Sequence, residues 1–148
     1  MTRATGVMVI AALALAVPMA DGAAPAKRYQ GSFEPGGTLS FKVKKRNGNK
    51  KVVRFKFQAF PLDCSGEPKT TSGYLDFAMR VNRKNRFRAK AIRGTASAPK
   101  ASLKLRGKLV GARNARGTMQ VEGSSVLVDP SGSAACASPR TKWSAKRT

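Results

Sequence analysis

Most of this chain alternates apolar and polar residues with a period of two. In residues 38–44, Leu39, Phe41 and Val43 alternate with polar side chains. The same alternation recurs in residues 51–60, 74–81, 86–92 and 103–109. Because successive side chains of a strand point to opposite faces of a sheet, this pattern is typical of strands with one buried face. The sequence therefore predicts an all-β fold.

The alternation also predicts which side chains face the core. For residues 51–60 it assigns the buried face to Val53, Phe55, Phe57 and Ala59, with Pro61 ending the strand. For residues 74–81 it assigns the buried face to Leu75, Phe77, Met79 and Val81. Further strands are expected at residues 28–33, at Met119 and Val121, at residues 124–128 and around Trp143.

Turn signals separate these segments, at residues 47–49, 82–85, 111–117 and 129–132. About eight short strands with turns between them predict an antiparallel β-sandwich (jelly-roll-like) or a small barrel. Residues 27–148 contain neither a repeat nor a linker, so they are expected to form a single all-β domain.

Residues 1–26 are predicted to be a signal peptide. Arg3 is followed by an apolar stretch at residues 7–17, by Pro18 and by small residues, with cleavage after Ala20, Gly22 or Ala26. The alternative is an uncleaved anchor, but the stretch is short for a membrane span. We expect a secreted protein, extracellular or in the cell envelope, with no membrane span after cleavage.

The chain has two cysteines, Cys64 and Cys136. In an exported protein such a pair is expected to form a disulfide, here closing a loop of about 70 residues that contributes about 4 kcal/mol of stability. The alternative is a reactive thiol, which the absence of any neighbouring histidine disfavours.

Several residues together match a known pattern. They are Tyr29 and Gly31, then Cys64, then Gly117 and Thr118, then Cys136, and finally residues 143–147, WSAKR. In these features the chain resembles an uncharacterised family of small secreted actinobacterial proteins that are β-sandwich-like, carry two cysteines and end on C-x(n)-W-(T/S)-A-(K/R)-R. The resemblance implies a secreted all-β domain with one disulfide, and it carries over no catalytic residue.

The composition disfavours an enzyme. The chain has no histidine, which removes the commonest general base and metal ligand. Asp63 and Glu67 lie close together in the sequence, as the paired carboxylates of a glycosidase could, but both flank turn residues. We expect a non-enzymatic protein with no catalytic residues, no metal site and no cofactor.

Charge is the feature that remains. Lys and Arg number 29 against 7 Asp and Glu, a formal net charge of +22. Alternation places a set of cations on the polar faces of four predicted strands: Lys42, Lys44, Arg54, Lys56, Arg86, Arg88, Lys90, Lys104, Arg106 and Lys108. If these strands are neighbours, the cations form one anion-binding face. The alternative is a solvated exterior that serves solubility.

Two possible functions follow from this distribution of charge. The first is binding of anionic polymers, such as cell-wall polymers, polysaccharide or extracellular DNA, through a basic sheet face. The second is a structural or interaction protein of the envelope that binds another protein, with the charge merely solvated. Specific nucleic-acid recognition is not expected, since the phenylalanines fall on the apolar faces. Trp143 is expected to fill the core, with ligand stacking as the alternative.

Overall fold

The computed structural model describes residues 24–93, 101–124 and 135–148. These residues form β-strands and no helix. The strands are β1 (Lys27–Phe33), β2 (Thr38–Arg46), β3 (Asn49–Cys64), β4 (Glu67–Leu75), β5 (Met79–Val81), β6 (Arg86–Arg93), β7 (Ala101–Val110), β8 (Asn114–Ser124), β9 (Ala135–Ala137) and β10 (Thr141–Arg147). The predicted signal peptide up to residue 23, the predicted strand at 124–128 beyond its first residue, and the predicted turn at 129–132 lie outside the described residues.

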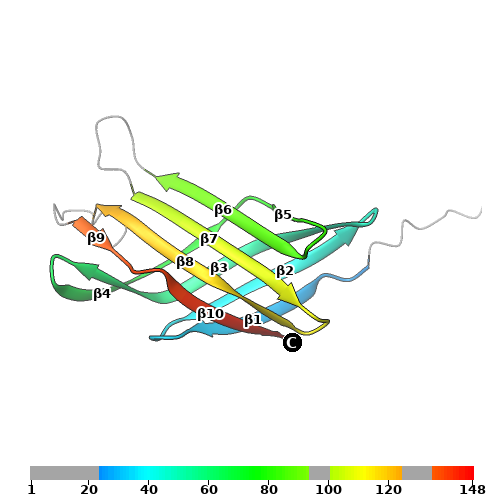
Figure 1. Cartoon of the computed structure of the whole chain (residues 1–148), viewed down its shortest axis with the longest axis horizontal. Helices are drawn as coiled ribbons and strands as arrows, with labels where there is room; N and C mark the ends of the chain where they lie inside the picture. The colour runs from blue at the N-terminus through cyan, green and yellow to red at the C-terminus, as the bar shows by residue number, and fades with distance from the viewer. Residues whose placement is uncertain (1–23, 94–100, 125–134) are drawn as a thin grey trace, which may run out of the picture.

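The strands form one antiparallel sheet that closes on itself. Its order is β10-β1-β2-β3-β9-β8-β7-β6, and β8 also pairs with β10, which completes a six-strand ring. β6 and β7 extend the ring from β8, while β4 and β5 pair with β3. Figure 1 shows two walls: a first wall of β6, β7, β8 and β10, and a second wall of β1, β2 and β3 with β4 and β5.

The predicted all-β antiparallel class is therefore confirmed. The finer prediction is met only in part, because a six-strand barrel with extra strands is neither a jelly-roll sandwich nor a simple barrel. The ten strands exceed the expected eight or so. One extra strand arises because residues 74–81 do not form a single strand: β4 ends at Leu75 and β5 begins at Met79. Phe77, predicted to be buried, lies between them and is 41% exposed.

Two β-bulges in β3 change part of the predicted buried face of that strand, although Phe55 and Phe57 are buried as predicted. The first bulge lies where Ser40 of β2 pairs with Lys56 of β3 and Lys42 pairs with Val53. Two steps along β2 correspond there to three steps along β3, so β3 carries one extra residue. A second extra residue lies between Phe57 and Phe60. Each extra residue shifts the side-chain alternation by one position. The buried residues of this region are consequently Val52, Phe55, Phe57 and Phe60, and not Val53 and Ala59.

Two predicted strand ends are also wrong, one because of a bulge and one because β3 changes its pairing partner. β4 pairs with β3 as far as Phe55 and β5 begins pairing at Val52, so the break between β4 and β5 lies opposite the first bulge. Pro61 does not end β3, which continues to Cys64. Pro61 lies between the part of β3 that pairs with β2 and the part that pairs with β9, where an absent N–H is tolerated.

An aromatic cluster fills the space between the two walls. Phe41 on β2 lies within 5.9 Å of Phe87 on β6 and 6.0 Å of Trp143 on β10, measured between ring centroids. Tyr29 stacks on the same phenylalanine at 5.0 Å, and its burial raises the pKa of its phenol, an effect that Arg147 partly offsets. The cluster joins residues far apart in the sequence and holds the walls together.

Two glycines make room for two rings of this cluster, those of Phe87 and Trp143. Phe87, Gly107, Gly117 and Trp143 are direct cross-strand neighbours on the inner face of the first wall. Phe87 and Trp143 lean over the glycines, and their ring centroids are 6.2 Å apart. A Cβ atom at Gly107 would overlap the ring of Phe87, and one at Gly117 would overlap Trp143. The chain needs residues without side chains at these two positions.

The predicted disulfide is confirmed. Cys64, the last residue of β3, is bonded to Cys136 of the short strand β9, and the two are direct cross-strand neighbours. β9 has three residues and pairs with both β3 and β8. The disulfide therefore secures the shortest link in the ring.

We predict that Gly107→Ala lowers the free energy of unfolding by about 1–3 kcal/mol, the usual range for overpacking a core. Urea unfolding followed by tryptophan fluorescence measures the change, because Trp143 is the single tryptophan. Ser144→Ala, at an exposed position beside Trp143, is the control and should change stability little. Equal stability of the Gly107→Ala variant and the wild type would contradict the packing described here.

The double variant Cys64→Ala, Cys136→Ala should lose about 4 kcal/mol of unfolding free energy, since the bond spans 72 residues of sequence. Urea unfolding with and without a reducing agent checks this. The reducing agent should destabilise the wild type and leave the double variant unchanged. An unaltered urea midpoint in the double variant would show that the ring closes without this bond.

Candidate functional site

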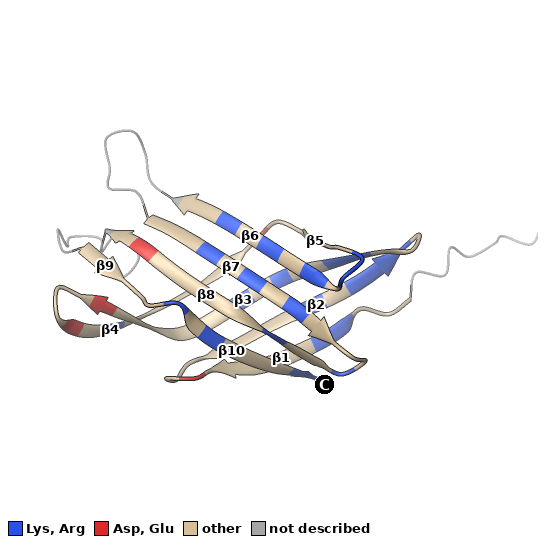
Figure 2. Cartoon of the chain, viewed as in Figure 1, with Lys and Arg blue, Asp and Glu red and all other residues tan. Residues whose placement is uncertain are grey.

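The structure divides the predicted cations between the two walls. Arg86, Arg88 and Lys90 lie on β6, directly beside Lys108, Arg106 and Lys104 of β7. Lys42, Lys44, Arg54 and Lys56 lie on β2 and β3, in the second wall. The four strands are not consecutive neighbours, so the cations form two groups and not one continuous face. Figure 2 shows the blue segments of β6 and β7 side by side and those of β2 and β3 on the strands behind.

The group on the first wall forms a regular array. The register pairs Arg86 with Lys108, Arg88 with Arg106, and Lys90 with Lys104, so each of three successive cross-strand positions holds two cations. Neighbouring strands are about 4.8 Å apart, and successive outward residues of one strand about 7 Å apart. All these side chains are exposed, because Phe87 and Leu105 on the same strands take the inner face.

β8 and β10 continue this array. Arg116 of β8 lies beside Lys108, and Lys142 of β10 lies beside Thr118, which in turn pairs with Arg106. We call the whole set the first basic face: Arg86, Arg88, Lys90, Lys104, Arg106, Lys108, Arg116 and Lys142. Sequence reasoning missed Arg116 and Lys142. Each of them precedes an inner-face residue, Gly117 or Trp143. The sequence around these two residues gave little sign that Arg116 and Lys142 lie on the same sheet face.

A shallow hollow crosses this face. Its volume is about 670 Å³, and it is open to solvent. The cations around it are Arg86, Arg106, Lys108, Arg116 and Lys142, with the single carboxylate of Glu34 at its border. A hollow that cations surround on several sides favours an anionic group over a neutral one.

Tight turns hold the array in place. The Asn82 side chain accepts hydrogen bonds from the backbone N–H groups of Lys84 and Arg86, at 3.0 and 2.9 Å, and so fixes the start of β6. The backbone N–H of Leu109 donates to the carbonyl of Asn85 at 2.9 Å, which ties the turn to β7. These hydrogen bonds fix the turn before β6 and hold it against β7.

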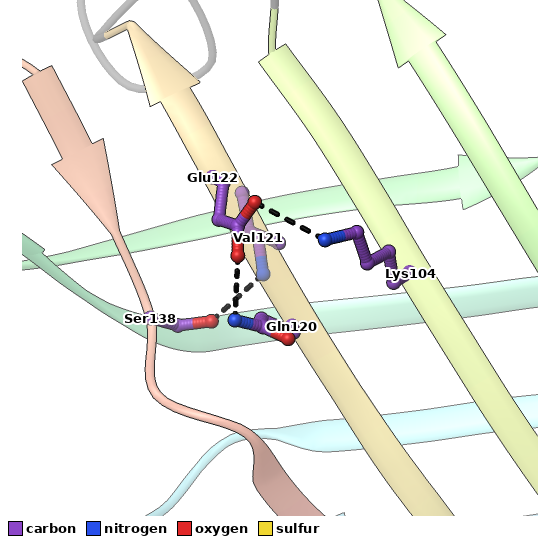
Figure 3. A network of polar contacts seen from close by, with 5 residues as sticks. All are labelled: Lys104, Gln120, Val121, Glu122 and Ser138. Atoms are coloured by element: carbon purple, nitrogen blue, oxygen red, sulfur yellow. Dashed lines mark hydrogen bonds and ion pairs between the residues drawn. The ribbon is translucent and has the colours of Figure 1, made fainter.

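One carboxylate neutralises a cation of the array near the start of β7. Glu122 of β8 forms an ion pair with Lys104 at 3.3 Å and accepts a hydrogen bond from Gln120 at 2.6 Å (Figure 3). Next to it, the Ser138 hydroxyl accepts a hydrogen bond from the Val121 N–H at 2.8 Å. Among the described residues, the only other ion pair is Lys69 with Glu67. Within that part of the chain, the other cations of the first basic face have no carboxylate at ion-pair distance.

The other predicted sites are placed clearly. Trp143 is 2% exposed and packs against Phe41, Phe55 and Phe87, so it is part of the core, and it also lines the bottom of the hollow on the first basic face. Asp63 accepts a hydrogen bond from the Gly66 N–H at 2.7 Å, which confirms its expected role in a turn.

Two further features are absent from the described residues. Residues 24–93, 101–124 and 135–148 contain no group of three or more Cys, Asp or Glu side chains arranged to hold a metal ion. The same ranges contain no helix that is long and apolar enough to cross a membrane.

Comparison of the chain with protein-family models, with curated proteins and with solved structures finds no match. We therefore infer function from the geometry and charge described above.

Repulsion within the first basic face can be measured. Like charges directly opposite each other destabilise a sheet, and favourable cross-strand pairs contribute about 0.2–1 kcal/mol, which sets the scale expected for such repulsion. A double-mutant cycle with Arg88→Gln and Arg106→Gln should give a repulsive coupling energy of about this size, weakened by added NaCl. The cycle with Lys104→Gln and Glu122→Gln is the matched control and should give an attractive coupling. An attractive or zero coupling between Arg88 and Arg106 at low salt would contradict this geometry.

Proposed function

We propose that this protein is a secreted, non-enzymatic protein that binds anionic polymers of the cell envelope or the extracellular space through its first basic face. One observation carries the proposal: three successive cross-strand pairs on β6 and β7 each join two cations. The predicted signal peptide and the disulfide are compatible with export.

The energetics of the array favour an anionic ligand. Each like-charged pair destabilises the free protein. An anion placed between the two cations of a pair replaces this repulsion with two attractions and releases counterions into solution. The sheet fixes the cation spacing in advance, so only the side chains must become ordered on binding.

The shape of the array favours a polymer over a small molecule. The cations extend across four strands, and the hollow among them is shallow and open. A linear chain with repeated phosphate, sulfate or carboxylate groups can contact several pairs at once. Affinity then accumulates over many weak contacts, which require no enclosed pocket.

The alternative function is docking of another protein on apolar surface. Tyr74, Phe77 and Ile92 are large apolar residues that are 57%, 41% and 59% exposed. They lie on three different elements: β4, the connection after it and β6. Binding through them would tolerate salt and would not respond to charge reversal on the first basic face.

We predict that the triple variant Arg86→Glu, Arg88→Glu, Lys90→Glu loses most of its affinity for polyanions. Each new glutamate faces a retained cation of β7, so folding should be preserved. Titrations with heparin, poly(glycerol phosphate), duplex DNA and a neutral glucan, at low and high NaCl, measure the effect. For duplex DNA, the slope of log affinity against log salt should become shallower by about three.

The matched control is Lys45→Glu, Lys69→Glu, Arg140→Glu, which removes the same net charge from exposed positions outside the first basic face. It should retain most of the affinity. Equal losses in both triple variants would mean that net charge alone acts. Binding of the neutral glucan, or salt-independent binding that neither variant changes, would favour the alternative function.

A further inference from the structure

The cations of the second wall lie outside the first basic face, and the proposed function gives them no role. We call seven cations of this wall the second basic face: Arg28, Lys42, Lys44, Lys51, Arg54, Lys56 and Arg80. The register sets Arg28 beside Lys42, Lys44 beside Lys51, and Lys51 beside Arg80. Cations again neighbour cations across the strands, and no described carboxylate forms an ion pair with any of them.

The two basic faces point away from each other. Phe41 and Phe87, which meet across the core at 5.9 Å, are inner-face residues of β2 and β6. Because side chains alternate along a strand, the neighbours Lys42 and Arg88 point outward from opposite walls. Packed sheets lie about 10 Å apart, so the hydrophobic core separates the two sets of cations. A short, stiff polyanion lying on one face cannot touch the other.

We propose that the protein holds two polyanion chains at once, one on each basic face, and so bridges them. The inference rests on the proposed function, since it requires that the first basic face binds polyanions. It goes beyond that function because a protein with one such face only coats a polymer, whereas one with two opposed faces links chains together. The partner on the second basic face is another segment of the same class of polymer.

The stoichiometry of a short, rigid probe tests this directly. A DNA duplex of about 12 base pairs is far shorter than the persistence length of about 150 base pairs, so it cannot wrap around the protein. At low salt, titration of the wild-type protein with this duplex should reach two duplexes per protein. Beads that carry one duplex should also capture a second, labelled duplex when the protein is added.

Two variants separate the faces. Arg86→Glu, Arg88→Glu, Lys90→Glu removes the first basic face, and Lys42→Glu, Lys44→Glu, Arg80→Glu removes the second, with each new glutamate of the second set facing a retained cation. Each variant should bind one duplex and lose capture of the labelled duplex. The control Lys45→Glu, Lys69→Glu, Arg140→Glu should bind two and still capture. Glutamine at the same positions replaces glutamate if a variant fails to fold, as circular dichroism would show.

Each outcome has one meaning. One duplex per wild-type protein, lost only when the first basic face is changed, would overturn bridging and leave the proposed function intact. Capture that persists in both single-face variants would show bridging through self-association, which also overturns the inference. The absence of any salt-sensitive duplex binding by the wild type would remove the proposed function itself.

Discussion

The contact between the two walls through Phe41 is the interaction on which the rest of this structure depends. Its ring meets Phe87 and Trp143 of the first wall and stacks with Tyr29 of the second. Burial of these rings is the main stabilising term available to the fold. Once the aromatic side chains lie inside, alternation places their neighbours outside, except at the two bulges of β3. The positions of both basic faces follow from this packing.

Repulsion among the surface cations opposes the stabilisation that the core provides. A net charge of +22 and rows of paired cations raise the free energy of the folded state, because folding brings these charges close together. The aromatic core, the strand pairing of the closed ring and the disulfide between Cys64 and Cys136 compensate for this repulsion. A chain selected only for solubility has no need to align its cations opposite one another, whereas a chain that binds anions gains from the alignment. Anion binding would thus relieve a strain that the fold itself creates.

Much of the fold could be predicted from the sequence because alternation is a local signal. It identified β2, β6, β7 and the inward side chains of β10, and the cysteine count suggested the disulfide. The errors lie where a single residue changes the alternation. The bulges at Arg54 and Ala59 place non-glycine residues at φ of 54° and 51°, and residue type gave no warning of either. They moved Ala59 out of the core and Phe60 into it.

The candidate site was predictable only in pieces. The outward positions of Arg86, Arg88 and Lys90 follow from alternation, but their pairing with β7, and the separation of β2 and β3 from that array, depend on strand order. Strand order is set by contacts between distant segments, such as β1 with β10 and β3 with β9, which no short stretch of sequence encodes. Gly107 and Gly117 show the same limit, since their role is visible only where Phe87 and Trp143 lean over them.

The most direct test of anion binding by an ordered array is an NMR titration of the oxidised protein with a heparin octasaccharide, following the arginine Nε–H signals. We predict that the signals of Arg88 and Arg106 shift saturably while that of Arg140 stays in place. Shifts spread evenly over all arginines, or confined to the amides around Tyr74, Phe77 and Ile92, would contradict it.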